Sequence, residues 1–303
     1  MVLFSFRLIE LHDRLSKGGL LNKAKILVEF GIDSKTFQRD IDKLRLYYSE
    51  KGLGDIKYDR KNNCYRVESR PYQLSKKEIF ALCKILIESR AFNKREFIDI
   101  IDKLLKLCQK DEAKEVYRAI NNEKVNYIEL QHGKDLISEI WELRQTITEQ
   151  QVIQIDYKRA DNKVKQHKVK PVGIVFSEFY FYLLAFQMDE KIKYPTIFRI
   201  DRIQKINITN TRFSVPYSQR FSEAEFKKRI QFMYSGELKT VCFEFTGVLE
   251  ALLDKLPTAQ IEKEIEGGVI VRAEVFGNGI NMWLRSQGTK VKILGEESSR
   301  VWK

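Results

Sequence analysis

The side chains that most often carry out chemistry are few and scattered in this sequence of 303 residues. Four cysteines occur without a CxxC pair, at Cys64, Cys83, Cys108 and Cys242, and three histidines lie at His12, His132 and His167. This spacing favours neither a zinc site nor a disulfide framework, so we expect no bound metal. The cysteines are typical of small buried hydrophobes in a reducing cytoplasm.

No arrangement of residues typical of an enzyme is found either. The sequence contains no Walker motif, no GxGxxG loop and no clustered carboxylates, and Gly277-Asn278-Gly279 is too short a signal. No Ser/His/Asp or Cys/His set can be nominated for nucleophilic catalysis. We therefore expect a protein that is not an enzyme and needs no cofactor.

Cations, in contrast, are abundant and unevenly placed. There are 54 Lys and Arg against 42 Asp and Glu, a formal net charge of +12. All of that excess falls in residues 1–70, with a net charge of +5, and in residues 151–220, with +7. Two surfaces that face polyanions are indicated. Charge alone leaves open that these lysines and arginines merely keep surfaces solvated.

Residues 1–70 have the pattern of a helix-turn-helix. One apolar stripe, Phe4 to Leu15, predicts a first helix that ends at Gly18-Gly19, and Asn22 can cap a second helix over residues 23–30. Gly31 ends that helix, and Ser34 is expected to cap a third. The inward positions of the third helix are Phe37, Ile41, Leu44 and Tyr48.

The outward face of this third helix suits duplex DNA, because it offers hydroxyls and cations for phosphates and Gln and Arg for base edges. Residues 56–58 and 65–67 predict a β-hairpin around residues 61–63, which would be a wing. The DNA-contact candidates are Lys23, Ser34, Lys35, Thr36, Gln38, Arg39, Lys43, Arg45 and Lys61. A packing or dimerisation module with an exposed basic face is the alternative.

The stretch from Gly31 to Arg45 resembles the recognition helix of the DeoR-type winged helix. That family has the pattern Ser-x-(Arg/Lys)-Thr-x-x-Arg-Asp-(Ile/Leu)-x-x-Leu-(Arg). Lys35 to Arg45 matches each of its fixed positions, and Ser34 stands one residue after the place of the family's Ser. The resemblance implies a winged helix-turn-helix that binds double-stranded DNA.

Residues 71–150 predict a helical bridge without net charge. Pro71 closes the first unit, and Ser75 with Glu78 forms a capping box. Apolar stripes indicate helices around residues 79–86, 97–107 and 136–147. The bridge would space the two basic modules; a subunit interface and packing within one monomer both remain open.

Residues 151–220 are rich in branched and aromatic residues and predict a small β-barrel. Residues 197–203 alternate strictly, so Arg199 and Asp201 are expected on one face and Phe198 and Arg202 on the other. Arginine forks suit phosphates, and tyrosine rings can stack on bases.

This region resembles the WYL domain. Phe181-Tyr182-Leu183-Leu184-Ala185 stands for its Trp-Tyr-Leu-x-Ala, and Phe198 to Ile203 stands for its Phe-Arg-x-Asp-Arg-Ile, while His167 replaces a usual Arg. The resemblance implies an Sm-like barrel that binds an anionic effector, such as a nucleotide or single-stranded nucleic acid. The effector-contact candidates are Tyr157, His167, Lys168, Tyr182, Arg199 and Arg202. Phe181 and Phe198 are expected in the core, and Arg202 has the alternative of pairing with Asp201.

Residues 221–303 alternate as strand, helix, strand, strand, helix, strand, which is the order of a ferredoxin-like module. They resemble the C-terminal extension that follows the WYL domain, with Asn281 to Gly288 in the place of its last helix and Trp283 in the core. The resemblance implies help in dimerisation, so we expect a homodimer.

Together these patterns predict a multidomain α+β protein with boundaries at 1–70, 71–150, 151–220 and 221–303. No segment is long and apolar enough to span a membrane, so a cytoplasmic protein is expected. The leading hypothesis is a transcriptional regulator that binds DNA and senses an anionic effector. A nucleic-acid-binding accessory of a partner enzyme and a nucleic-acid-processing enzyme are the alternatives.

Overall fold

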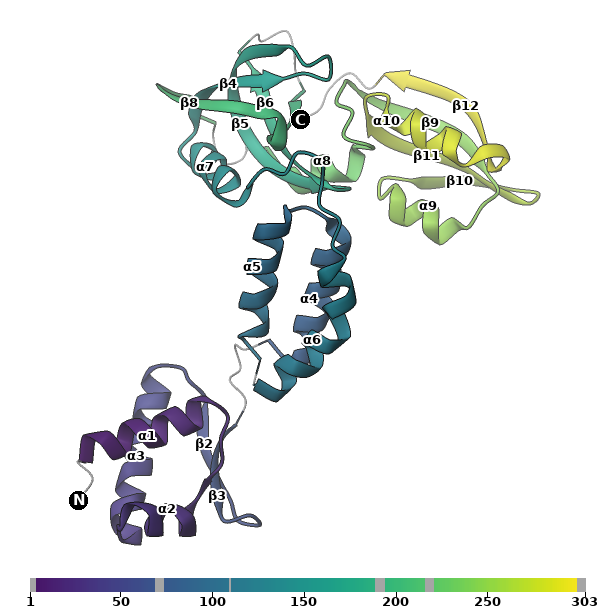
Figure 1. Cartoon of the computed structure of the whole chain (residues 1–303). Helices are drawn as coiled ribbons and strands as arrows, with labels where there is room; N and C mark the ends of the chain where they lie inside the picture. The colour runs from purple at the N-terminus through teal and green to yellow at the C-terminus, as the bar shows by residue number, and fades with distance from the viewer. Residues whose placement is uncertain (1–3, 69–73, 109, 189–193, 216–220, 299–303) are drawn as a thin grey trace. The chain divides into compact units, whose positions relative to one another are not determined.

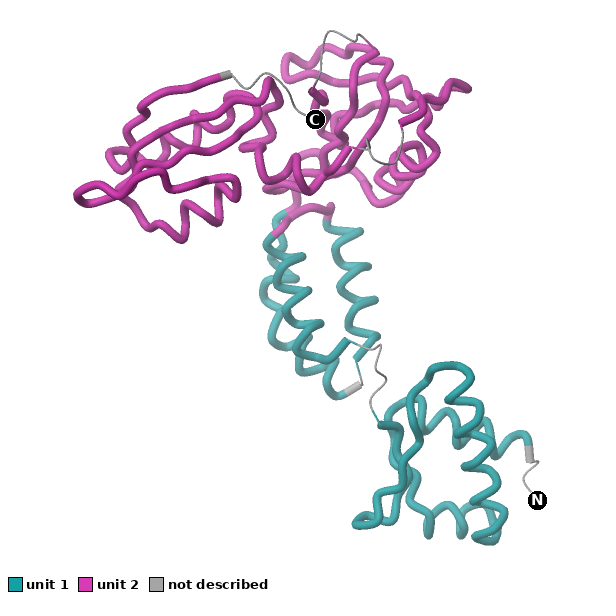
Figure 2. Tube along the Cα trace, turned by 180° about the vertical axis from the view of Figure 1, so that it is seen from behind, with its two compact units in different colours: residues 1–88, 94–128 teal, residues 89–93, 129–303 magenta. Residues whose placement is uncertain are grey.

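A computed structural model describes residues 4–68, 74–108, 110–188, 194–215 and 221–298 of a mixed α+β protein with three antiparallel sheets (Figure 1). The chain divides into two compact units, one of residues 1–88 and 94–128 and one of residues 89–93 and 129–303 (Figure 2). The four domain boundaries expected from the sequence stay predictions. Among the described residues, no helix has the length and apolarity that crossing a membrane requires.

The N-terminal part of the first unit contains three helices and a small sheet. Its elements are α1 (Phe4–Ser16), β1 (Leu21–Asn22), α2 (Lys23–Phe30), α3 (Ser34–Glu50), β2 (Asp55–Asp59) and β3 (Cys64–Glu68). The sheet order is β1-β3-β2. Leu11, Phe37, Ile41 and Tyr48 are fully buried in one core, which confirms the apolar stripes of α1 and α3.

Local signals set the bounds of these helices. The Asn22 side chain accepts a hydrogen bond from the Lys25 amide at 3.1 Å, and Gly31 ends α2 with a φ of +62°. Ser34 was expected to cap α3, and that is wrong. Asp33 has the extended backbone of a cap and accepts from the Thr36 amide at 2.7 Å, so Ser34 becomes the first helical residue.

Three further helices belong to the same unit and lie side by side in Figure 1: α4 (Lys76–Ser89), α5 (Lys94–Leu105) and α6 (Lys110–Val125). The capping box is confirmed, because the Ser75 amide donates to the Glu78 carboxylate at 2.7 Å and the Glu78 amide donates to Ser75 Oγ at 3.3 Å. Sequence patterns missed α6. Leu82, which belongs to the apolar stripe predicted for residues 79–86, is 37% exposed. Pro71 lies outside the described residues.

The second unit begins with a helix on a five-stranded sheet. These elements are α7 (Ile137–Thr148), β4 (Gln151–Lys158), β5 (Val164–Ser177), β6 (Tyr180–Gln187), β7 (Thr196–Arg199), the 3₁₀ turn η1 (Ile200–Arg202) and β8 (Ile203–Arg212). Leu136 and Leu143 pack with Ile153 and Ile155 in one core. The helix α7, expected in the bridge, therefore covers this sheet instead.

The strand order β7-β6-β5-β4-β8 places consecutive strands at the two edges of the sheet. Because η1 has only three residues, the sheet must curve until β7 and β8 approach each other there. Closure into a barrel stays a prediction. The expected alternation of residues 197–203 is wrong beyond Arg199, since a 3₁₀ turn does not place successive side chains on opposite faces.

The C-terminal part has the predicted order of elements. They are β9 (Leu238–Phe245), α9 (Leu249–Lys255), β10 (Gln260–Ile265), β11 (Gly268–Phe276), α10 (Gly279–Ser286), the turn η3 (Gly288–Lys290) and β12 (Val291–Ser298). The antiparallel sheet order β10-β11-β9-β12 agrees with a ferredoxin-like module. Trp283 lies in its core, as expected, and is 8% exposed.

A short helix connects the two sheets of this unit. It is α8 (Glu223–Arg229), whose Phe226 is fully buried. Phe226 packs with Val175 and Leu184 of the five-stranded sheet and with Phe276 of the four-stranded sheet. The two sheets of the second unit thus share one apolar cluster.

Candidate functional site

The exposed side of α3 carries a row of cations. Lys35, Arg39 and Lys43 are exposed and follow each other at intervals of four residues, so they lie along one side of the helix. The opposite side is the buried stripe that includes Phe37 and Ile41. Ser34 is exposed and Thr36 is half-buried at the start of the helix. The structure therefore brings these five predicted DNA-contact residues together on one surface.

Gln38 and Arg45 lie on the same helix but have partners within the protein. Tyr65 Oη donates to Gln38 Oε1 at 3.0 Å, and Gln38 Nε2 donates to the Asp42 carboxylate at 3.0 Å. Arg45 donates to the same carboxylate oxygen at 3.1 Å and, through Nε, to the Ile56 carbonyl at 3.1 Å. These bonds attach the β2–β3 hairpin to the middle of α3.

The tip of the hairpin adds two exposed cations, Arg60 and Lys61. The Asp59 carboxylate accepts from the Lys61 and Asn62 amides at 3.0 and 3.3 Å, which holds the turn. Lys61 was predicted from the sequence, whereas Arg60 was missed. Lys23, also predicted, is half-buried, and its amide donates to the Asn63 carbonyl at 3.1 Å.

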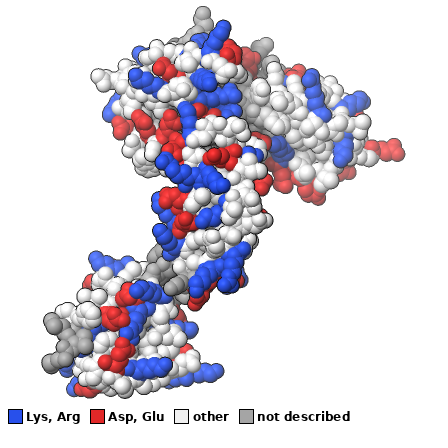
Figure 3. Space-filling view, in the orientation of Figure 1, with Lys and Arg blue, Asp and Glu red and all other residues white. Residues whose placement is uncertain are grey.

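A buried ion pair supports α3 from behind. Arg7 Nε of α1 donates to the Asp40 carboxylate at 2.6 Å, and both side chains are under one tenth exposed. Asp40 follows Arg39 directly, so α1 fixes the rotation of the helix that presents the cations. Figure 3 shows basic side chains interspersed with acidic ones on the visible face.

A second cluster surrounds Arg199 at the end of β7. Its guanidinium donates to the Asp201 carboxylate through Nε at 3.1 Å and Nη2 at 2.8 Å. The guanidinium carbon lies 3.5 Å from the centre of the Tyr180 ring. Tyr182 pairs with Arg199 across the β6–β7 ladder, and burial raises the pKa of its hydroxyl. Tyr180 and Tyr182 share a face because they are two residues apart on one strand.

Tyr157 and His167 lie on another part of the sheet, against the core. Both rings contact Phe198 at 5.1 Å between centres, which confirms Phe198 as a core residue. The Tyr157 hydroxyl accepts from the Arg199 amide at 3.3 Å. Burial, with Lys165 nearby, lowers the pKa of His167. This environment therefore disfavours the charged form of His167.

The remaining two candidates are separate from these groups. Lys168 follows His167 on β5 and so points to the opposite face, where it is exposed and pairs in register with Gln154. Arg202 lies half-buried in η1. The alternative that Arg202 pairs with Asp201 is wrong for the described residues, because the Asp201 carboxylate binds Arg199 instead.

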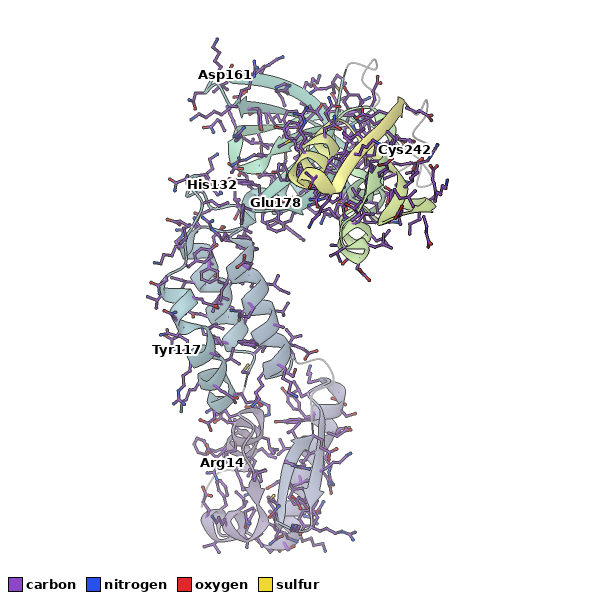
Figure 4. All side chains as sticks on the ribbon, turned by 90° about the vertical axis from the view of Figure 1, so that its right-hand side faces the viewer. Arg14, Tyr117, His132, Asp161, Glu178 and Cys242 are labelled. Carbon is purple, nitrogen blue, oxygen red and sulfur yellow. The ribbon has the colours of Figure 1, made fainter. Side chains whose placement is uncertain are left out.

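The segment before α7 contributes residues that sequence reasoning missed. His132, labelled in Figure 4, accepts from the Lys134 amide at 3.0 Å through Nδ1, while its Nε2 is buried without a partner. Burial lowers the pKa of His132, and Asp201 acts in the opposite direction. Lys134 Nζ donates to the Ile203 carbonyl at 2.7 Å, and burial raises the pKa of Glu139. Only tertiary packing brings these groups to Asp201.

Within the described part of the chain, no three His, Cys, Asp or Glu side chains gather as a metal site would need. The arrangement instead offers cations and aromatic rings. These groups can bind phosphates and bases.

Comparison with known structures gives similarity of low degree over most of the chain. Proteasome accessory factor B/C (PafBC) of Arthrobacter aurescens is 16% identical with a TM-score of 0.32; the alignment covers 95% of this chain and 45% of that one. The chain thus spans less than half the length of that structure. A CRISPR Cas-related protein is 14% identical with a TM-score of 0.37, over 95% of this chain and 77% of that one.

A comparison with curated protein sequences gives no match. The model of one family, the WYL domain, matches residues 140–208. That range runs from α7 through β4 to β7 and into β8, and it includes Tyr157, Tyr182 and Arg199. The curved sheet in the second unit, together with α7, is therefore a WYL domain, which this chain contains at residues 140–208.

Proposed function

We propose that this protein is a DNA-binding transcriptional regulator whose WYL domain senses an anionic effector. The observation that carries the proposal is the exposed row of Lys35, Arg39 and Lys43 on α3, opposite a fully buried stripe. A packing helix would bury such a row. A helix that enters the major groove needs cations for phosphates and long polar side chains for base edges.

The elements around α3 support a winged helix-turn-helix of the DeoR type. A turn of three residues joins α2 to α3, and the β2–β3 hairpin extends beside α3 with Arg60 and Lys61 at its tip. In this proposal Lys35, Arg39 and Lys43 contact DNA directly. Gln38 and Arg45 hold the hairpin in place through Asp42 and Tyr65, so their contribution is one of positioning.

The effector would bind around Arg199, Tyr180 and Tyr182. The guanidinium uses Nε and Nη2 for Asp201, which leaves its outer N–H groups for a phosphate or carboxylate. A nucleotide or a single-stranded nucleic acid fits this combination of a cation with aromatic rings. The effector would change DNA binding by favouring one of two arrangements of a homodimer, because a ligand shifts an equilibrium only through different affinities for its states.

Replacement of Arg39 by Ala tests DNA binding. With a labelled duplex of mixed sequence, we expect affinity to fall by about 1–3 kcal/mol and the slope of log affinity against log salt to decrease by about 1. Fluorescence anisotropy over a series of salt concentrations measures both. Lys17→Ala is the matched control, because Lys17 is an exposed cation just after α1 that is paired with Asp13.

Unchanged duplex affinity in a folded Arg39→Ala variant would contradict the proposed docking of α3. The same labelled duplex also tests the enzyme alternative. Cleavage by the purified protein without a partner would exclude a simple regulator.

A double variant that removes both charges of the Arg199–Asp201 ion pair tests the effector site. Arg199→Ala alone would leave Asp201, which is 5% exposed, buried without its partner, and so would destabilise the fold. The double variant Arg199→Gln/Asp201→Asn removes both charges and keeps similar shapes. We expect duplex binding to persist, while a nucleotide or a short single strand no longer changes it. A response equal to that of the unmodified protein would contradict effector binding at Arg199.

A further inference from the structure

The ferredoxin-like module contains a cavity on the side of its sheet that the helices cover. Leu252 of α9 and Trp283 of α10 pack with Phe243, Phe245 and Val271, so both helices lie on the same face. The strand β9 has eight residues and spans about 26 Å, whereas the seven residues of α9 span about 10 Å. Helices this short leave part of the sheet face uncovered.

The floor of the cavity is apolar and aromatic. It has a volume of about 300 Å³, and its lining includes Phe245, Leu252 and Trp283. These three side chains are 3%, 0% and 8% exposed, so they belong to the core of the module. The Phe245 and Trp283 rings are stacked with centres 6.4 Å apart. The volume lies at the lower end of the range of small-molecule sites, about 300–1,000 Å³.

The charged residues that line the cavity are both cations. Lys255 and Lys290 belong to the lining, which has no acidic member among the described residues. Lys255 Nζ lies 5.3 Å from the centre of the Phe232 ring. On the opposite face of the same sheet, in contrast, Lys292 is paired with Glu244. The cavity thus combines an apolar floor with positive charge that no carboxylate in the lining neutralises.

We propose that this cavity binds a small organic anion with an apolar ring, of the class of aryl carboxylates. The ring would lie against Phe245 and Trp283, and the carboxylate would accept hydrogen bonds from Lys255 and Lys290. The proposal does not depend on DNA binding or on the Arg199 site, because the cavity lies wholly within residues 245–290.

Phenylacetate is a suitable probe, and phenylacetamide is its neutral match. NMR of the ¹⁵N-labelled full-length protein measures binding through the indole N–H resonance of Trp283. This resonance is assigned as the one that disappears in Trp283→Phe. We expect phenylacetate to shift this resonance in a saturable way and phenylacetamide to bind about tenfold more weakly, since a hydrogen bond to a charged group is the stronger one. No shift with phenylacetate, or equal affinity for the two probes, would overturn the proposal.

Two variants locate the binding. Lys255→Gln/Lys290→Gln should weaken phenylacetate binding by about tenfold or more, whereas Lys292→Gln, the same change on the opposite face, should leave it unchanged. Ala251 lines the cavity and is exposed, so Ala251→Trp should block entry and leave the core intact. Equal phenylacetate affinity in the double lysine variant or in Ala251→Trp, with the fold verified by thermal unfolding, would place the probe elsewhere and refute the site.

Discussion

Residues predicted to share one role differ in what their side chains already bind. On α3, Lys35 and Arg39 are exposed, whereas Gln38 and Arg45 are engaged with Tyr65, Asp42 and a backbone carbonyl. In the WYL domain, Arg199 is engaged with Asp201, while Lys168 is exposed on another face. Residue type thus indicates what a side chain can bind, and its neighbours determine what remains available.

We expect His132 to make the stability of the second unit dependent on pH. Burial lowers the pKa of His132 below the ordinary 6.5, and the nearby Arg199 and Lys134 act in the same direction. Asp201 acts in the opposite direction. The unfolded chain then binds more protons than the folded one just below pH 6.5, so stability is complete above this pH and decreases as the pH falls through the lowered pKa. The raised pKa of Glu139 acts in the opposite direction, nearer its ordinary value of 4.5.

We expect His132→Gln to reduce this loss of stability on acidification, because glutamine cannot be protonated. Chemical unfolding at pH values on either side of 6.5 measures it. His167 is also buried with a lowered pKa, so part of the pH dependence should persist in the variant. A pH dependence identical to that of the unmodified protein would show that His132 is not its source.

At the scale of elements, local rules worked where neighbours along the chain decide the structure. Asn22 caps the start of α2 and Gly31 ends it, and the Ser75–Glu78 capping box precedes α4. The rules failed where two neighbouring residues could both cap a helix, and where the alternating pattern of a strand gave way to a 3₁₀ turn. Asp33 rather than Ser34 caps α3, and a 3₁₀ turn replaces the expected continuous strand at residues 200–202. That turn positions Asp201 for the bidentate contact with Arg199.

At the scale of the whole molecule, the second unit depends on one shared cluster. Phe226 of α8 packs between the WYL sheet and the ferredoxin-like sheet, with Val175 on one and Phe276 on the other. This contact explains why residues 129–303 form one compact unit although each sheet has a core of its own.

Phe226→Ala should therefore destabilise the second unit by about 3–5 kcal/mol and separate the unfolding of its two sheets. Differential scanning calorimetry would show an additional transition. Leu252→Ala is a matched control, because Leu252 is equally buried but lies wholly within the C-terminal core. A single unchanged transition in Phe226→Ala would contradict the coupling.

The sequence by itself determined most of the elements and the chemistry of the candidate surfaces. Periodicity, caps and turn residues are local, so the bounds of α2 and the order of elements in the C-terminal module could be predicted from neighbouring residues. Only the tertiary structure decided which groups meet. The contact of Arg7 with Asp40, the approach of His132 to Asp201 and the cavity beside Trp283 depend on residues far apart in the chain. Packing of whole elements sets such distances, and no local pattern encodes them.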